Sequence, residues 1–466
     1  MGKNLHIRLF IWITLTCTFS FAQNVSNIKD AYGRTVILHG LNTSSSAKGE
    51  GTEHSDHQPW IKASDVEREY HLFGFNAVRY LIFWGAIEPE KDKYDEAYLA
   101  KVKERVEWYT SRKMYVIFDM HQDVYGYGVG GNGAPVWASS YSKTKNLVPD
   151  KWPWWMQNME PTVVKSYVQF FKYKKKKELQ DHYIQAWLKV VNMFKDNPYV
   201  IGYDLMNEPH GGKLIKTLAG GFERKWLSAM YKRLIPAIRK EDTSRYIFFE
   251  PRSFGVNFGM KSHLPIVKDT IVNKLVYAPH CYLTFVDVGG DYKKKHKNSL
   301  KKWFKYRQKE TAKHQSGLLL GEFGLSPGKK DFDKYLNDIF SRLDEAQGSW
   351  TYWSSDLGGW GPLNGDRSPS PILNELLRIY PQAVAGELLS YTYEPSAHKF
   401  TMHMMSDTTI HAPTIIAIPL QKYSAFPVVK ITSESPFEMD KDSKNNTLVL
   451  TVKEHRKLVD IEISIP

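Results

Sequence analysis

Two glutamates each follow an otherwise apolar run of the sequence. Glu208 ends the run "VIGYDLMNE" (200–208), and Glu322 lies in "GLLLGEFG" (317–324). Glycoside hydrolysis requires at least two facing carboxyl groups. One must be protonated to give its proton to the leaving oxygen, and the other must be ionised to attack the anomeric carbon. An arginine near one and burial near the other can separate their pKa values. The two positions therefore predict an acid and a nucleophile that share one site.

Other polar side chains also follow apolar runs. They are Asn42, Arg79, Asp119, His121, Asp123, Asn207, Glu250, His280, Tyr282 and Trp353. A single glutamate at a strand end is more often part of an ion pair or a helix cap. The whole set favours catalysis, because Asn207 adjoins one acid while Arg79 and His280 are available to the other.

Alternation of two kinds of segment predicts the fold. Eight short apolar or β-branched runs are expected as strands, at 35–42, 76–83, 115–120, 200–208, 247–251, 274–282, 317–324 and 349–355. Between them lie amphipathic stretches with apolar residues at helical spacing, among them 95–113, 178–197, 222–242 and 330–347. This pattern predicts an α/β (β/α)8 TIM barrel, in which the active site lies at the carboxyl ends of the strands.

Beyond Pro381 the pattern changes to short runs that alternate at period two and are separated by turn residues. We predict a small C-terminal antiparallel β-sandwich there. The expected organisation is a signal peptide at 1–22, a barrel domain at 23–385 and the sandwich at 386–466.

The N-terminal residues resemble a secretory signal. Basic Lys3 and Arg8 precede an apolar run, and small residues Ser20 and Ala22 precede the expected cleavage site. We therefore expect a secreted or periplasmic protein without a membrane span. Its only cysteine after cleavage is Cys281, so it has no internal disulfide. The net charge of +13 falls to about +11 after cleavage, which predicts attraction to acidic surfaces.

Several of these motifs together resemble glycoside hydrolase family 5. They are "NEP" (207–209), "GEFG" (321–324), Arg79, "HCY" (280–282) and Trp353, and the resemblance covers about residues 30–380. It implies a retaining β-glycosidase with Glu208 as acid/base and Glu322 as nucleophile.

A narrower resemblance to the endoglycoceramidase branch rests on "LHGLNTSSSAKG" (38–49), "DMHQDVYG" (119–126), "GNGAPVWA" (131–138) and the C-terminal sandwich. It implies cleavage between an intact glycan and ceramide. It also implies that Lys48, His121, Asp123, Asn207, Tyr282 and Trp353 line the first sugar subsite.

The segment after the third expected strand, 122–177, is long and rich in aromatic residues: Tyr125, Tyr127, Trp137, Tyr141, Trp152, Trp154, Trp155, Phe170 and Phe171. These rings either wall a groove for a lipid aglycone or pin the segment to the barrel. Lysines at 172, 174–177 and 293–302 lie near expected helix starts. They either form an ordinary solvated face or give transient contact with an anionic membrane surface or with acidic glycolipids.

Three functions remain open on the sequence. The first is hydrolysis of glycosphingolipids at the ceramide bond. The second is an exo-β-glucosidase acting on steryl glucoside or glucosylceramide, or a β-glucanase. The third is a non-catalytic glycolipid-binding protein, which the presence of both glutamates disfavours. The sequence has no phosphate-binding loop, dinucleotide fingerprint or nucleic-acid module, and we expect no cofactor, no metal site and a monomer.

Overall fold

The computed structural model describes residues 27–51, 56–140, 148, 153–172, 177–283, 286, 290–419, 421–423, 427–442 and 445–464. Eight parallel strands form a closed barrel, which confirms the predicted fold. They are β2 (His39–Asn42), β3 (Ala77–Ile82), β4 (Tyr115–Met120), β5 (Val200–Asp204), β6 (Tyr246–Phe249), β7 (Leu275–Tyr277), β8 (Gly317–Leu320) and β9 (Ser349–Tyr352).

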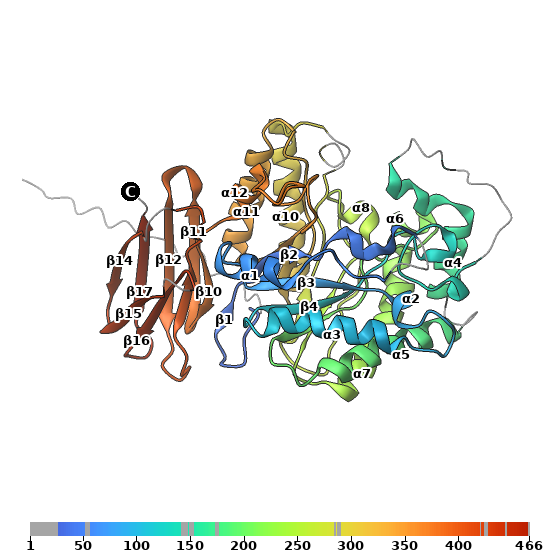
Figure 1. Cartoon of the computed structure of the whole chain (residues 1–466), viewed down its shortest axis with the longest axis horizontal. Coiled ribbons are helices and arrows are strands. Elements are labelled where there is room, and N and C mark those ends of the chain that lie inside the picture. The colour runs from blue at the N-terminus through green and yellow to red at the C-terminus, as the bar shows by residue number, and fades with distance from the viewer. Residues whose placement is uncertain are drawn as a thin grey trace, which may run out of the picture.

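Helices surround the barrel (Figure 1). They are α1 (Ala63–His71), α2 (Trp84–Ile87), α3 (Glu96–Thr110), α4 (Pro161–Phe171), α5 (Lys177–Phe194), α6 (Leu214–Leu218), α7 (Ser228–Glu241), α8 (Ser253–Val256), α10 (Lys294–His314), α11 (Phe332–Ala346) and α12 (Pro371–Leu376). The expected helices at 95–113, 178–197, 222–242 and 330–347 correspond to α3, α5, α7 and α11.

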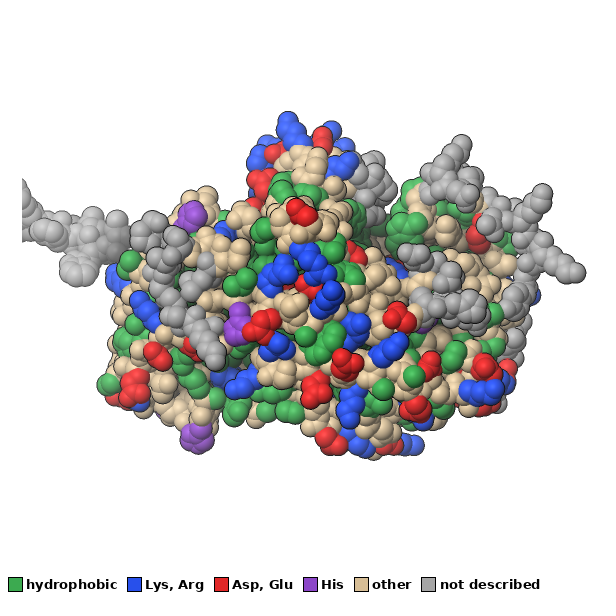
Figure 2. Space-filling view, in the orientation of Figure 1, with side chains coloured by type: hydrophobic (Ala, Val, Ile, Leu, Met, Phe, Trp, Pro, Cys, Tyr) green, Lys and Arg blue, Asp and Glu red, His purple; other side chains and the backbone are tan. Residues whose placement is uncertain are grey.

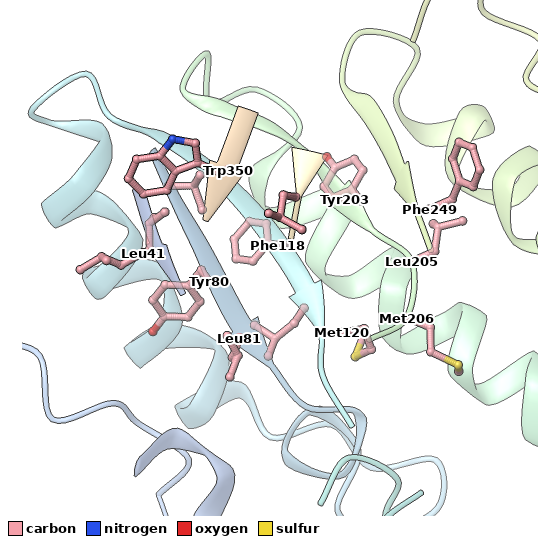
Figure 3. Close-up of a cluster of buried hydrophobic side chains, with 14 of the residues drawn as sticks. Leu41, Tyr80, Leu81, Phe118, Met120, Tyr203, Leu205, Met206, Phe249 and Trp350 are labelled. Carbon is pink, nitrogen blue, oxygen red and sulfur yellow. The ribbon is translucent and has the colours of Figure 1, made fainter. Parts of the chain in front are cut away.

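Alternate residues of the barrel strands point to two different places: the apolar core shared with the helices, and the interior of the barrel. Leu41, Tyr80 and Trp350 belong to the large core shared with the helices, and Figure 3 shows them on neighbouring strands. Neighbouring positions such as Asn42 and Arg79 instead point inward and bond across the barrel. The pleat of a strand thus separates packing on one face from polar chemistry on the other.

The C-terminal residues form two antiparallel sheets. One has the order β1-β10-β13-β16-β15 and the other β11-β12-β17-β14. Their strands are β1 (Thr35–Val36), β10 (Tyr380–Val384), β11 (Gly386–Glu394), β12 (Lys399–Ser406), β13 (Thr414–Ala417), β14 (Val428–Ser433), β15 (Phe437–Asp442), β16 (Thr447–Val452) and β17 (Leu458–Ser464). The sandwich is confirmed, and its first sheet includes β10, which precedes residue 386.

The prediction of one strand over 35–42 is wrong. Thr35 and Val36 form β1, which pairs with Val384 and Ala383 of β10, and the barrel strand begins only at His39. Ile28, Val36 and Ala383 pack into the same inner core as Ile117 and Phe248 of the barrel. The apolar run from 35 to 42 is therefore continuous because both of its parts are buried, although in different sheets.

Candidate active site

Arg79 lies at the centre of a buried polar cluster at the carboxyl ends of the barrel strands. Its side chain is fully buried and lies 2.9–3.0 Å from one oxygen of each of four carboxylates: Asp119, Asp204, Glu250 and Glu322. It also donates hydrogen bonds to Asn42 Oδ1 and Asn207 Oδ1, both at 3.0 Å. The five N–H groups of a guanidinium allow one side chain to orient so many acceptors.

We expect Arg79→Met to destabilise the fold by about 3–5 kcal/mol, because it leaves several buried carboxylates without their cation. Chemical denaturation measures this change. Arg342→Met is the matched control, since Arg342 pairs with Glu345 at the surface and should cost less than about 1 kcal/mol. Equal stability losses in the two variants would contradict this role for Arg79.

Glu322 is held in its ionised form. Its Oε1 accepts a hydrogen bond from Arg79 at 2.9 Å, and its Oε2 accepts one from the Tyr282 hydroxyl at 2.9 Å. Burial alone would raise the pKa of Glu322, but the positive charges of His280 and Arg79 outweigh burial and lower that pKa from 4.5. A charged, positioned carboxylate is what a nucleophile requires.

Two neighbouring acids behave differently. Burial raises the pKa of Asp204 and of Glu250, although both also contact Arg79. Among these two and Glu322, Glu322 is therefore the group that most readily keeps its negative charge.

Glu208 is fixed through both its backbone and its side chain. Its φ of 45° is unusual for a residue other than glycine. The backbone N–H donates to Glu250 Oε2 at 2.9 Å, and the carbonyl accepts from Gln122 Nε2 at 3.1 Å. Asn257 Nδ2 donates to the carboxylate Oε1 at 2.6 Å. The side chain is still 18% exposed, so Glu208 faces the pocket from a rigid position.

His280 lies between the two glutamates. Its Nδ1 is 2.9 Å from Glu208 Oε1 and 3.5 Å from Glu322 Oε2, and one ligand atom of each of the three residues lies within 4.8 Å of the other two. Retaining glycosidases place their carboxyl groups about 5–5.5 Å apart, whereas inverting enzymes leave a wider gap for water. The short separation of Glu208 and Glu322 fits retention. Gly321 makes room for this arrangement, since a Cβ there would lie 2.9 Å from His280 Nε2.

The charge on His280 gives a prediction for the pH dependence of activity. Burial would lower the pKa of His280, but Glu250 and Glu322 raise it well above 6.5, so the ring is a cation at neutral pH. His280→Gln removes this charge and so raises the pKa of Glu322. Since Glu322 must be ionised, activity is lost as pH falls through its pKa, and the acid limb of the kcat/KM profile should move to higher pH.

His210→Gln is the matched control for this experiment. His210 also lines the pocket, but burial lowers its pKa to about 4, so it is neutral over most of the working range. Its replacement should leave the acid limb in place. An unmoved acid limb in His280→Gln would contradict the electrostatic role of His280.

One end of the pocket is polar. Lys48 Nζ lies 2.7 Å from Asp123 Oδ2 and 4.2 Å from the centroid of the Trp353 ring. His121 stacks against Trp353, with centroids 5.5 Å apart and an interplanar angle of 12°, and its Nε2 lies 3.3 Å from Asp123. Burial would raise the pKa of Asp123, but Lys48 and His121 lower it, so this carboxylate is an acceptor for hydroxyl groups.

The other end of the pocket is aromatic. The cavity has a volume of about 260 Å³ and is lined there by Trp154, Trp155, Phe254 and Phe258. Trp155 lies 6.0 Å from Phe254 and 5.7 Å from Phe258, measured between ring centroids. A pocket lined by both a polar and an aromatic group of side chains, with Glu208 among them, suits a ligand that is part sugar and part apolar.

Some aromatic residues of the segment 122–177 hold the segment against the barrel, and others line the pocket. Tyr125, Tyr127, Phe170 and Phe171 are buried, as residues that hold the segment against the barrel should be. Trp154 and Trp155 instead line the pocket. Trp137 is partly buried against the core. Tyr141 and Trp152 lie outside the described residues, as do Lys174, Lys175 and Lys176.

The residues singled out in the sequence occupy two layers. Lys48, Asp123, Glu208, Tyr282 and Trp353 line the pocket. Arg79, His121, Asn207, His280 and Glu322 lie behind them, each at most 5% exposed. Three further residues of the site, Asn257, Gln122 and Asp204, were not predicted from the sequence. Asp204 could have been predicted from the sequence, because it is a carboxylate inside an apolar strand. Asn257 and Gln122 have no sequence pattern that distinguishes them from other amide side chains in loops.

Two groups of side chains in the described residues have the spacing of metal ligands. One is the catalytic trio of Glu208, His280 and Glu322, and the other is Glu88, Asp92 and His182. In the first, the raised pKa of His280 favours a protonated ring, which repels a cation. In the second, Glu88 already accepts hydrogen bonds from Trp84 Nε1 and from the Asp92 N–H, both at 2.9 Å.

Comparison with known proteins agrees with this geometry. Residues 30–358 match the family Cellulase (glycosyl hydrolase family 5), and residues 378–465 match the glycoside hydrolase family 5 C-terminal domain. Endoglycoceramidase I of Rhodococcus hoagii is 26% identical over 383 residues, which are 78% of this chain and 72% of that protein.

Two solved structures of endo-glycoceramidase II from Rhodococcus sp. are each 31% identical and cover 94% of this chain and 99% of theirs. One is a complex with ganglioside GM3, with a TM-score of 0.85, and the other is a lactosyl-enzyme intermediate, with a TM-score of 0.82. The chain therefore belongs to glycoside hydrolase family 5 and is a retaining glycoside hydrolase of the endoglycoceramidase branch.

Proposed function

We propose that this enzyme hydrolyses the glycosidic bond between the glycan and ceramide of glycosphingolipids through a covalent glycosyl-enzyme intermediate. The observation that carries the proposal is the pocket itself, which Glu208 lines together with polar and aromatic side chains, and beside which Glu322 lies close to Glu208. The sugar would occupy the polar end and the first part of ceramide the aromatic end. The endoglycoceramidase relatives support this assignment.

In the first half of the reaction, a Glu322 oxygen attacks the anomeric carbon and forms an ester with the sugar. The bond from that carbon to the ceramide oxygen breaks, and Glu208 gives its proton to that oxygen, so that ceramide leaves as a neutral alcohol. His280 and Asn257 both contact Oε1 of Glu208, which makes Oε2 the oxygen that would hold the proton. We assign the sugar 2-hydroxyl to Asn207, which would bind it as the ring flattens.

In the second half, Glu208 takes a proton from water while the water oxygen bonds to the anomeric carbon. The ester to Glu322 breaks, and Glu322 regains its negative charge. Two inversions at one carbon retain the β configuration. Arg79 and Tyr282 hold Glu322 in the orientation that both steps require.

We also propose that the protein is exported and acts as a monomer. The pattern of Lys3, Arg8, the apolar run and Ala22 supports a signal peptide over residues 1–22. Within the described residues, no helix has the length and apolar content that crossing a membrane requires. Replacing Ala22 by a large residue should retain an unprocessed chain, which mass analysis of the purified protein detects.

Incubation with lactosylceramide tests the proposed bond specificity. Release of intact lactose and ceramide supports cleavage at the ceramide bond. Release of galactose first would support the exo-acting alternative, and turnover of a β-glucan with no turnover of lactosylceramide would support a glucanase. Either of these two outcomes overturns the proposal.

A further inference from the structure

A cationic surface with an exposed aliphatic side chain lies beside the aromatic end of the pocket. It consists of Lys172, Lys213, Ile215, Lys216, Lys225 and Trp226, and we call it the α6 surface. Ile215 is 85% exposed although it lies on a helix of a folded domain. Lys213 and Lys225 are also exposed. Surfaces that contact membranes combine lysines with exposed apolar side chains, and the α6 surface has both.

The lysines of the α6 surface are close to one another. Lys216 Nζ lies 3.7 Å from the centroid of the Trp226 ring, and Lys172 Nζ lies 5.4 Å from it. Burial, and then the like charges of Lys172, Lys225 and Lys213, lower the pKa of Lys216. Among the described residues, none of these four lysines forms an ion pair with a carboxylate. Anionic groups from outside the chain would supply the opposite charge that these gathered lysines lack.

The α6 surface is continuous with the aromatic end of the pocket. Helix α6 contacts α8, which carries Phe254 of the aromatic wall, and Figure 1 shows the two helices side by side. Leu218 of α6 approaches Gly255 of α8 closely, since a Cβ there would lie 3.5 Å from the Leu218 side chain. Trp154, which also lines the aromatic end, is 53% exposed. The apolar wall of the pocket therefore reaches the outer surface at Trp154, and α8, which carries Phe254 of that wall, adjoins the helix that carries Ile215.

A second group of lysines is less suited to this role. Lys293, Lys294, Lys295 and Lys297 are exposed at the start of α10, and Figure 2 shows basic side chains on the projection that carries α10 to α12. Acidic side chains are interspersed there, and Lys297 pairs with Asp338 at 2.7 Å. The α6 surface combines charge, exposed apolar area and contact with the pocket wall.

We propose that the α6 surface docks on a bilayer that contains anionic lipids, with Ile215 inserted among the lipids and the four lysines at their headgroups. This inference rests on the proposed function, because docking would place the aromatic end of the pocket against the membrane that holds the substrate. Each lysine near an anionic membrane contributes about 1 kcal/mol of attraction, so the surface has enough charge to concentrate the enzyme there.

Vesicle binding without any glycolipid tests docking separately from catalysis. The full-length enzyme should co-sediment with phosphatidylcholine vesicles that contain phosphatidylglycerol, less with phosphatidylcholine alone, and less at high salt. The variant K213E/K216E/K225E should lose about 100-fold or more in affinity. Ile215→Ser should weaken binding several-fold with no change in charge.

Matched controls exist for both changes. K103E/K240E/K430E makes the same change in net charge at exposed lysines elsewhere, and Val272→Ser removes an aliphatic side chain that is 80% exposed in the segment before β7. Both controls should bind vesicles as the unchanged enzyme does. If either control weakens binding as much as its α6 counterpart, or if the two α6 variants bind normally, the proposal is overturned.

Activity measurements distinguish docking from substrate recognition. The α6 variants should keep normal turnover of a water-soluble aryl lactoside and lose turnover of lactosylceramide in anionic vesicles. Equal loss on both substrates would assign the lysines to the sugar site and overturn docking. If the unchanged enzyme binds vesicles but never cleaves lactosylceramide, docking stands and the proposed substrate fails.

Discussion

Glu322→Gly should lower kcat on lactosylceramide by roughly 10⁵-fold or more, because no covalent intermediate can form without its carboxylate. Added azide should restore turnover, since it can enter the space left by the side chain. Azide then attacks the anomeric carbon from the face that Glu322 occupied, so the product should be the α-glycosyl azide. Nuclear magnetic resonance of the product reads this configuration directly.

The stereochemical readout separates a nucleophile from a residue that only supports the fold. Tyr282→Phe is a useful comparison, because it removes the hydroxyl that donates to Glu322 and leaves the carboxylate in place. It should lower activity by a smaller factor, on the order of 10-fold for one hydrogen bond, and azide should not rescue it. Formation of a β-glycosyl azide by Glu322→Gly would contradict the assignment of Glu322 as nucleophile.

The loss of activity in Glu208→Ala should depend on the leaving group: it should be large for a leaving group that needs a proton and small in the first step for one that does not. On lactosylceramide the loss should be about 10²–10⁴-fold, because an alkoxide leaves poorly without a proton. On a dinitrophenyl lactoside the first step needs no proton, so a rapid burst of phenol should precede a slow phase in which the glycosyl-enzyme accumulates. Stopped-flow absorbance measures the burst, and mass analysis detects the enzyme with lactose attached.

Azide gives the opposite configuration in this variant. Azide attacks the accumulated glycosyl-enzyme from the face opposite Glu322, where Glu208 would otherwise activate water. The product should therefore be the β-glycosyl azide. Asn257→Ala is the comparison, since it removes one contact to Glu208 Oε1 and keeps the acid. Equal losses of Glu208→Ala on both leaving groups, with no burst, would show that Glu208 is not the acid.

The barrel was predictable because its strands are buried on both faces and its helices on one. This difference in burial is visible in the sequence. Strands appear as continuous apolar runs, such as 115–120 and 317–320, and helices as amphipathic stretches, such as 330–347. The division of 35–42 between two sheets was not predictable. Thr35 and Val36 have the composition of a buried strand wherever they pair, and only tertiary contacts decide that their partner is β10.

The catalytic pair was predictable for a related reason. A carboxylate at the end of an apolar strand is costly to bury unless it has a function or a partner, so Glu208 and Glu322 stand out. Their supporting contacts were harder to predict. Asn257 reaches Glu208 from a loop after β6, and its role depends on distances of a few ångströms that sequence spacing does not encode.

The pairing of β1 with β10 also has a consequence for how the chain must fold. Thr35 pairs with Val384, and Ile28, Val36 and Ala383 together close the end of the barrel opposite the catalytic site. The first barrel strand therefore cannot reach its final surroundings until nearly the whole barrel has been made, a non-local topology that slows folding. The first sheet of the sandwich thus covers the end of the barrel opposite the catalytic site. The barrel that positions the catalytic residues is therefore complete only when this sheet has formed.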